Sequence, residues 1–203
     1  MKKLLCLVLS VCFILGLSSC GKKDKDENTT LDLAKYAKAG EMPEAKYGLG
    51  ANPDDVIADL SGIEEDILDE EKQEIENGAD HDHNHDQEEF YFERVEGENN
   101  VMLDNGKICY YYTKANADKG ISCIVSYENA FGFELGTLII DVKEKVKDVN
   151  FVEEPLTEEN AFFASYAFDG TVLKAEFDKA TIIFVFQENE LFATAIYNEN
   201  WTA

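Results

Sequence analysis

The three histidines of this chain all lie in one acidic stretch, residues 80–86, which reads Asp-His-Asp-His-Asn-His-Asp. Alternate side chains of an extended backbone point to the same side, so His81, His83 and His85 would share one side of the stretch. Neutral imidazoles together with a carboxylate such as that of Asp82 are the ligands that zinc or nickel prefers. The stretch therefore predicts capture of zinc or nickel. The alternative is a solvated acidic loop whose histidines hold no metal.

Two cysteines in strand-like runs, Cys109 and Cys123, are the next candidates for chemistry. A hairpin closed around Asn116 would place their side chains directly opposite each other. Alternation would then put three further residues on the same face: Tyr111, Ile121 and Val125. In an oxidising compartment the two thiols would form a disulfide that stabilises the fold by about 3 kcal/mol. The alternative is a pair of small, reduced core residues.

The N-terminus carries a third reactive candidate, Cys20, just after an apolar run that ends at Leu17 and is preceded by two lysines. This order is typical of a secretory signal. The run is shorter than the roughly 20 apolar residues that span a bilayer, which argues against an uncleaved anchor.

The sequence Leu17-Ser18-Ser19-Cys20 resembles the lipobox of bacterial lipoproteins. The resemblance implies that residues 1–19 are a signal peptide and that Cys20 is lipidated, for example with palmitate. The mature protein would then be held on a membrane of the bacterial cell envelope, facing away from the cytoplasm. The membrane would be its first partner, through the N-terminal lipid.

The charge of the chain limits its other partners. There are 42 acidic and 18 basic residues, a net charge of −24 at neutral pH. Such a surface repels the phosphates of nucleic acids, so no nucleic-acid partner is expected. Cations or basic partners fit better, although solubility alone can also explain an acidic surface.

The pattern of apolar residues predicts an α+β fold. Residues 20–45 contain few large apolar side chains and are expected to be a lipidated cysteine followed by a flexible tether. A helix is expected from Asn52, with Val56 and Leu60 on its apolar stripe, and another over 137–147, with Thr137 as its cap. Short strands are expected after each helix and should form antiparallel meanders. Those after the second helix are expected over 162–168, 172–177, 181–186 and 191–197.

A short repeat links the two halves. Tyr47-Gly48-Leu49-Gly50 before the first helix lines up with Phe133-Glu134-Leu135-Gly136 before the second. This predicts two tandem α-then-β lobes, 46–136 and 137–203, with an acidic, histidine-containing insertion at about 69–89 in the first. The helices would cover one face of one sheet, or of two sheets side by side.

Such lobes resemble those of the secreted β-lactamase inhibitor protein family and of the small outer-membrane assembly lipoproteins. In these proteins a glycine is followed by a helix with an acid-valine step, as in Gly50 with Asp55-Val56 and Gly136 with Asp141-Val142. The resemblance implies a non-enzymatic protein-binding surface, often the concave face of the sheet.

The sequence thus predicts a lipid-anchored, extracytoplasmic binding protein that is not an enzyme. It would engage a protein or peptide of the envelope through a sheet surface. The alternative is a zinc- or nickel-handling lipoprotein that uses His81, His83 and His85. A third hypothesis, hydrolysis by paired carboxylates, has no pair singled out by spacing.

Overall fold

The structure is a computed structural model that describes residues 31–62, 92–146, 148–157, 160, 163 and 169–202. The expected signal peptide, Cys20 and the histidine stretch of residues 80–86 lie outside these residues. Predictions about them therefore stay predictions.

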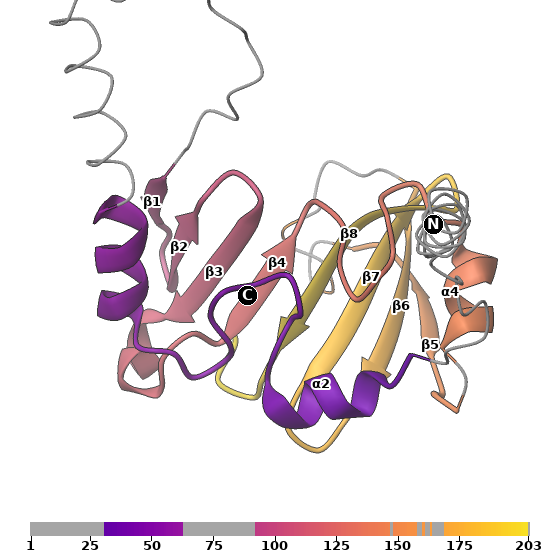
Figure 1. Ribbon diagram of the computed structural model, residues 1–203, viewed down its shortest axis with the longest axis horizontal. Helices are drawn as coiled ribbons and strands as arrows, with labels where there is room; N and C mark the ends of the chain where they lie inside the picture. Colours follow the sequence, from indigo (N-terminus) through magenta and orange to yellow (C-terminus); the bar gives the residue numbers. More distant parts are fainter. Residues whose placement is uncertain are drawn as a thin grey trace, which may run out of the picture.

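Eight antiparallel strands form one continuous sheet (Figure 1). Across the sheet the strands follow the order β1-β2-β3-β4-β8-β7-β6-β5. The first four strands along the chain therefore make one half of the sheet, and the last four make the other. The last strands of the two halves, β4 and β8, pair with each other at the centre of the sheet. The strands are β1 (Glu93–Glu96), β2 (Asn100–Asp104), β3 (Ile108–Thr113), β4 (Cys123–Ser126), β5 (Val152–Pro155), β6 (Thr171–Glu176), β7 (Thr181–Gln187) and β8 (Glu190–Tyr197). Two short pieces of 3-10 helix with a kink at Asn116 form η1 (Lys114–Lys119), which joins β3 to β4.

The described helices pack against one face of this sheet. They are α2 (Leu33–Ala39), the helical residues 53–62 and α4 (Ile139–Lys145). Each contributes buried apolar side chains to one core, which also takes alternate residues of the strands, such as Leu103 of β2 and Ile182 of β7. Figure 1 shows α2 and the chain after it lying in front of the sheet, with α4 at its right edge. The expected α+β class is therefore present, as a mainly β protein.

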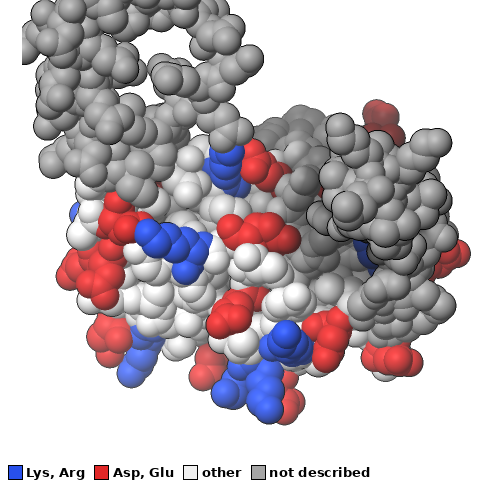
Figure 2. All heavy atoms as spheres, viewed as in Figure 1, with Lys and Arg blue, Asp and Glu red and all other residues white. Residues whose placement is uncertain are grey.

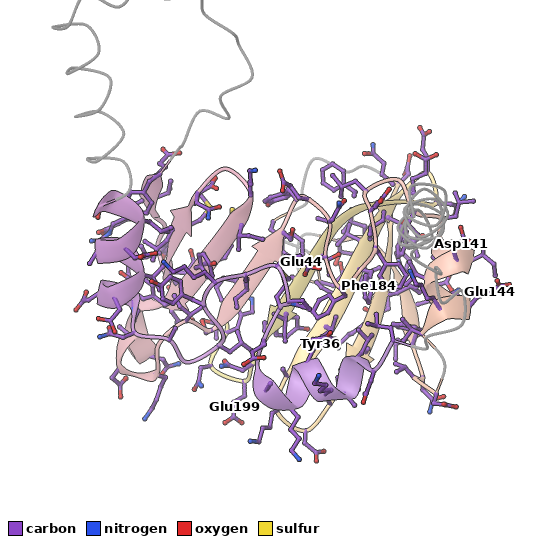
Figure 3. All side chains as sticks on the ribbon, in the orientation of Figure 1. Tyr36, Glu44, Asp141, Glu144, Phe184 and Glu199 are labelled. Carbon is purple, nitrogen blue, oxygen red and sulfur yellow. The ribbon has the colours of Figure 1, made fainter. Side chains whose placement is uncertain are left out.

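Aromatic rings fill the core between the N-terminal segment and the sheet. Phe131 contacts Tyr36 of α2 on one side and Phe184 of β7 on the other, with ring centroids 5.5 and 6.1 Å away. Figure 3 shows Tyr36, Glu44 and Phe184 close together in front of the sheet. The Glu44 carboxylate accepts the backbone N–H of Phe131 at 3.0 Å, which ties the loop before α4 to the segment after α2.

The expected flexible tether is wrong for the residues from Leu31 onward. Residues 33–39 form α2, whose Leu33 and Ala37 are fully buried. The Asp32 side chain accepts the N–H of Lys35 at its start, and Gly40 ends it at a φ of 71°. The composition of this stretch is polar, but two apolar side chains one helical turn apart suffice to dock a short helix on a core that other elements build.

Two further boundaries differ from the expectations. Thr137 is not the cap of α4, because its hydroxyl donates to the carbonyl of Glu134 and Leu138 takes the capping position. The strand that precedes β6 is β5, which the sequence did not reveal because its residues, Val-Glu-Glu-Pro, are mostly exposed at the edge of the sheet. The strand expected at 162–168 falls almost wholly outside the described residues, which include only Phe163 of it.

The two halves make the same backbone contacts between the residues before a helix and the beginning of the last strand. Gly50 donates its N–H to the carbonyl of Ile121 at 2.7 Å, and Ile121 donates to Ala51 at 2.8 Å. In the second half Gly136 donates to Leu191 at 2.8 Å, and Leu191 donates to Thr137 at 2.9 Å.

Two other features of the halves match. The two glycines adopt nearly equal left-handed conformations, with φ of 84° at Gly50 and 82° at Gly136. The aromatic residue before each packs edge-on against the penultimate strand of its half. The ring centroids are 5.9 Å apart for Tyr47 and Tyr110, and 5.7 Å apart for Phe133 and Phe184.

Candidate functional site

The sheet has a second face, turned away from the helices, which we call the rear face. Directly paired residues of neighbouring strands put their side chains on the same face. One row of such pairs on the rear face runs through Val95, Met102, Tyr111, Cys123 and Tyr197. The next row runs through Cys109, Val125, Ala195, Ile183, Lys174 and Val152. Both rows end in an exposed valine, Val95 at 39% and Val152 at 47% exposure.

The register separates the two cysteines that were expected to lie directly opposite each other. Cys109 pairs with Val125, and Tyr111 pairs with Cys123. The cysteines are therefore diagonal neighbours, about 7–8 Å apart in an antiparallel pair, whereas a disulfide needs Cβ atoms within about 4.5 Å. Both are free and buried thiols in the structure. The hairpin prediction failed because η1 lengthens the connection and shifts the register by two residues.

The shared face of the cysteines was predicted correctly for Tyr111 and Val125, which lie with both thiols in the rear-face cluster. Ile121 instead packs in the helix-covered core. It precedes β4, where the alternation of strand side chains does not apply.

A hollow of about 410 Å³ opens on the rear face over the second half of the sheet. It is lined by Glu154, Pro155, Thr157, Asn160, Val172, Lys174, Ile183 and Tyr197. Val172 and Ile183 make a buried apolar floor. Because the other lining residues are polar or at the edge of the sheet, the hollow combines an apolar base with a polar rim.

A turn of the chain after β5 shapes one side of the hollow. The Asn160 amide oxygen accepts the N–H of Thr157 at 2.8 Å, and the Thr157 hydroxyl accepts the N–H of Asn160 at 3.3 Å. The Asn160 amide nitrogen also donates to the carbonyl of Pro155 at 2.9 Å. These bonds hold the turn beside β5, and none of them involves Val172 or Ile183 of the floor.

Lys174 places a positive charge at the rim. Its ammonium lies 2.5 Å from a carboxylate oxygen of Glu176, two residues along the same strand. This hydrogen bond raises the pKa of Lys174, so the side chain is cationic at neutral pH. Glu154 and Glu176 bring two carboxylates near this single cation. Figure 2, which shows the helix-covered side, has acidic and basic side chains interspersed instead.

Tyr197 supplies an uncharged phenol to the same rim. Burial raises its pKa above the ordinary value, and the neighbouring positive charge of Lys174 opposes this only in part. The phenol is therefore neutral over the physiological range and can donate or accept a hydrogen bond.

Half-buried aromatic residues continue the rear face away from the hollow. Trp201 packs edge-on against Tyr111 with centroids 5.4 Å apart, and Phe192 against Tyr127 at 6.5 Å. The Tyr127 hydroxyl donates to the carbonyl of Phe163 at 2.9 Å. These contacts hold the rings in fixed orientations.

Val172 and Ile183 are 0% and 1% exposed, so a partner meets the polar rim of the hollow, where Lys174, Glu154 and Tyr197 can bind charged or hydrogen-bonding groups. The described residues include no histidine. Among them, no group of three His, Cys, Asp or Glu side chains could hold a metal ion.

The sequence did not single out Lys174 or Tyr197. The available signal was a lysine within the otherwise mainly apolar run Val172-Leu173-Lys174-Ala175, where alternation places Lys174 on the face of Val172. That face could not be assigned to the rear of the sheet until the sheet was assembled.

No family model matches this chain, and neither a curated protein nor a solved structure matches it. In the described part of the chain, no helix is long and apolar enough to cross a membrane.

Proposed function

We propose that this chain is a lipid-anchored, extracytoplasmic protein of the bacterial envelope that binds a protein or peptide partner through the rear face and carries out no chemistry of its own. The observation that supports it most is the hollow of about 410 Å³, with its apolar floor and its rim of Lys174, Glu154 and Tyr197. Val152, exposed and directly paired with Lys174, extends the apolar contact area beside the hollow.

The partner in this proposal presents apolar and basic side chains. Two carboxylates lie near one ammonium at the hollow, and the whole chain carries a net charge of −24. A basic segment would be attracted from a distance and would find carboxylate acceptors at the rim. An acidic segment would be repelled.

Two tandem α-then-β lobes form part of the proposal. The matched hydrogen bonds of Gly50 and Gly136, and the matched aromatic pairs, support a common origin of the halves. If Ile121 corresponds to Leu191, then Val125 corresponds to Ala195, and these two residues are paired with each other. That pairing is what a local two-fold axis through the centre of the sheet requires. It supports the proposal of two tandem lobes.

Site-specific photo-cross-linking in the producing cell tests the rear face. A photoreactive residue at Val152 should give a discrete adduct with an envelope protein, because this position borders the hollow. The matched control is Lys38, an exposed residue of α2 on the helix-covered side. It should give no such adduct.

A second substitution identifies the contribution of the hollow. Lys174→Glu in the Val152 cross-linking background should increase the adduct at least twofold, because a third carboxylate then replaces the cation at the rim and strengthens the attraction for a basic segment. The melting temperature of the purified variant reports whether it still folds. Equal adducts from Val152 and Lys38, or an adduct unaffected by Lys174→Glu in a folded protein, would contradict the proposal.

The zinc or nickel alternative rests on His81, His83, His85 and Asp82, outside the described residues. Calorimetric titration of the full chain with zinc would test it against a variant with the three histidines changed to alanine.

A further inference from the structure

The apolar residues that lead into α4 form a second exposed patch, separate from the rear face. Leu135, Leu138 and Ile140 are 45%, 44% and 53% exposed, and among the described residues the other exposed large apolar side chains are Val95 and Val152. Three such residues within six positions are unusual on a chain that is otherwise so acidic.

The backbone holds this patch rigidly. Gly136 and Ile139 donate their N–H groups to the carbonyls of Leu191 and Asn189, at 2.8 and 3.0 Å. Leu138 forms a bridge with Glu190 at the start of β8. The patch is therefore a fixed part of the edge of the molecule.

The N-terminal chain emerges next to the patch. The N–H of Leu31, the first described residue, donates to the carbonyl of Lys145 in the last turn of α4. A helix of this length is about 10 Å long, so the patch at its start lies close to the point of emergence. Ten residues lie between Cys20 and Leu31, and the eleven Cα–Cα steps of this extended chain reach at most about 40 Å.

The charge of α4 also suits a membrane surface. Asp141 and Glu144 are balanced by Lys143 and Lys145, whereas the whole chain is strongly acidic. Figure 3 shows Asp141 and Glu144 pointing away from the sheet at the edge of the molecule. The charges cancel only within α4, because the exposed Glu134 and Glu190 adjoin the patch, so the fitting surface is a zwitterionic membrane and not an anionic one.

We propose that Leu135, Leu138 and Ile140 rest in the interfacial layer of the membrane that holds the lipid on Cys20. The inference depends on the lipid anchor of the proposed function. A short tether keeps the patch at high local concentration near the bilayer, so a contact too weak to bind membranes alone becomes occupied. The sheet then stands on its α4 edge, and the rear face is turned sideways, where a partner can reach it.

Quenching by spin-labelled lipid tests this contact. The mature, lipidated protein is placed in phosphatidylcholine vesicles with a fluorophore on Ile140→Cys or, as a control, on Lys179→Cys in the turn after β6. Cys109 and Cys123 are buried, so labelling is confined to the introduced thiol. Quenching at position 140 should exceed that at position 179 at least threefold. Equal quenching at both positions, with the protein bound to the vesicles, would overturn the proposal.

A substitution within the patch provides the second measurement. Leu138→Ser in the Ile140→Cys background should reduce the quenching at least twofold and leave the melting temperature unchanged, because Leu138 is half-exposed. Shielding of the label that appears without vesicles and grows with protein concentration would assign the patch to a second copy of the chain and overturn the membrane contact.

Mass analysis of Cys20 separates the two possible failures. If Cys20 carries no lipid and the protein stays off the vesicles, the anchor fails, and the membrane contact fails with it. If Cys20 is lipidated but position 140 is not quenched, only the membrane contact fails. Partner binding by the rear face is read independently by cross-linking.

Discussion

At the scale of single residues, the clearest anomaly is a buried hydroxyl. Thr194 of β8 is fully buried between Ser126 and Phe184, its partners on the two neighbouring strands, and its Oγ1 has no hydrogen-bond partner in the described structure. A buried hydroxyl without a partner costs about 1–3 kcal/mol. Valine has nearly the same shape and no such cost.

Thr194→Val should therefore raise the free energy of unfolding by about 1 kcal/mol in a urea titration. Thr113→Val is the matched control, because the buried Thr113 hydroxyl donates to the carbonyl of Asn200 at 2.9 Å. Its loss should lower stability by about 1 kcal/mol. If Thr194→Val also lowers the free energy of unfolding, the Thr194 hydroxyl has a hydrogen-bond partner in solution.

The two buried thiols of the rear face should make the free energy of unfolding decrease at alkaline pH. Burial raises the pKa of both Cys109 and Cys123, and the charge of Asp104 adds to the effect at Cys109. In the folded state they keep their protons at a pH where an unfolded thiol, with a pKa of about 8.5, loses them. Above that pH the unfolded state binds fewer protons than the folded state, so stability falls as pH rises.

Between pH 8 and pH 10 the free energy of unfolding should fall by about 2 kcal/mol for each such thiol. Cys123→Ala should show a smaller loss over this interval than the unaltered protein, whatever its stability at pH 8. Urea titrations at the two pH values measure the difference. An identical loss in both proteins would mean that Cys123 ionises normally in the folded state.

At the scale of elements, one glycine lets two segments approach. Gly120, at a φ of 81°, lies just before Ile121, and a Cβ atom there would be 2.5 Å from the carbonyl oxygens of Gly50 and Ala51. Gly136 has nearly the same φ, 82°, but a Cβ there would meet nothing within 4 Å. The two positions share a positive φ, but Gly120, with a ψ of −162°, lies in a conformation essentially restricted to glycine and adds the steric clash.

Gly136→Ala should cost about 1–2 kcal/mol, the usual strain of a left-handed non-glycine residue. Gly120→Ala should cost about 2 kcal/mol more, because the backbone pairing of Gly50 with Ile121 has to open. Chemical denaturation of the two variants measures the difference. Similar losses of stability in the two variants would show that residues 50–51 move aside at no cost in free energy.

The elements differ in how well the sequence predicted them. The apolar strands β6, β7 and β8 were found because several core residues repeat within each. The edge strand β5 and the short helix α2 were missed, since one has exposed side chains and the other only two buried ones. Such elements form because a neighbouring element offers backbone partners or a surface, and this information is not local.

At the scale of the whole molecule, each half contributes four strands to one sheet, and the helices cover one side of it. The consequence is a division of surfaces. Both sides of the sheet hold a cluster of buried apolar residues, the rear face also carries the hollow, and the α4 edge carries the apolar patch and Leu31. A lipid anchor at that edge would leave the rear face free for a partner.

The sequence alone determined the class of the fold, most of the strands and the matching segments before the two helices, because apolar periodicity and glycine positions are local properties. It also predicts the lipid anchor on Cys20 and, as an alternative function, capture of zinc or nickel by the histidine stretch. Only the tertiary structure decided the register that keeps Cys109 and Cys123 apart, and the meeting of Lys174 with Tyr197 in one hollow. Both depend on which strands become neighbours and on how each connection sets their offset, and these are long-range consequences of packing the whole chain.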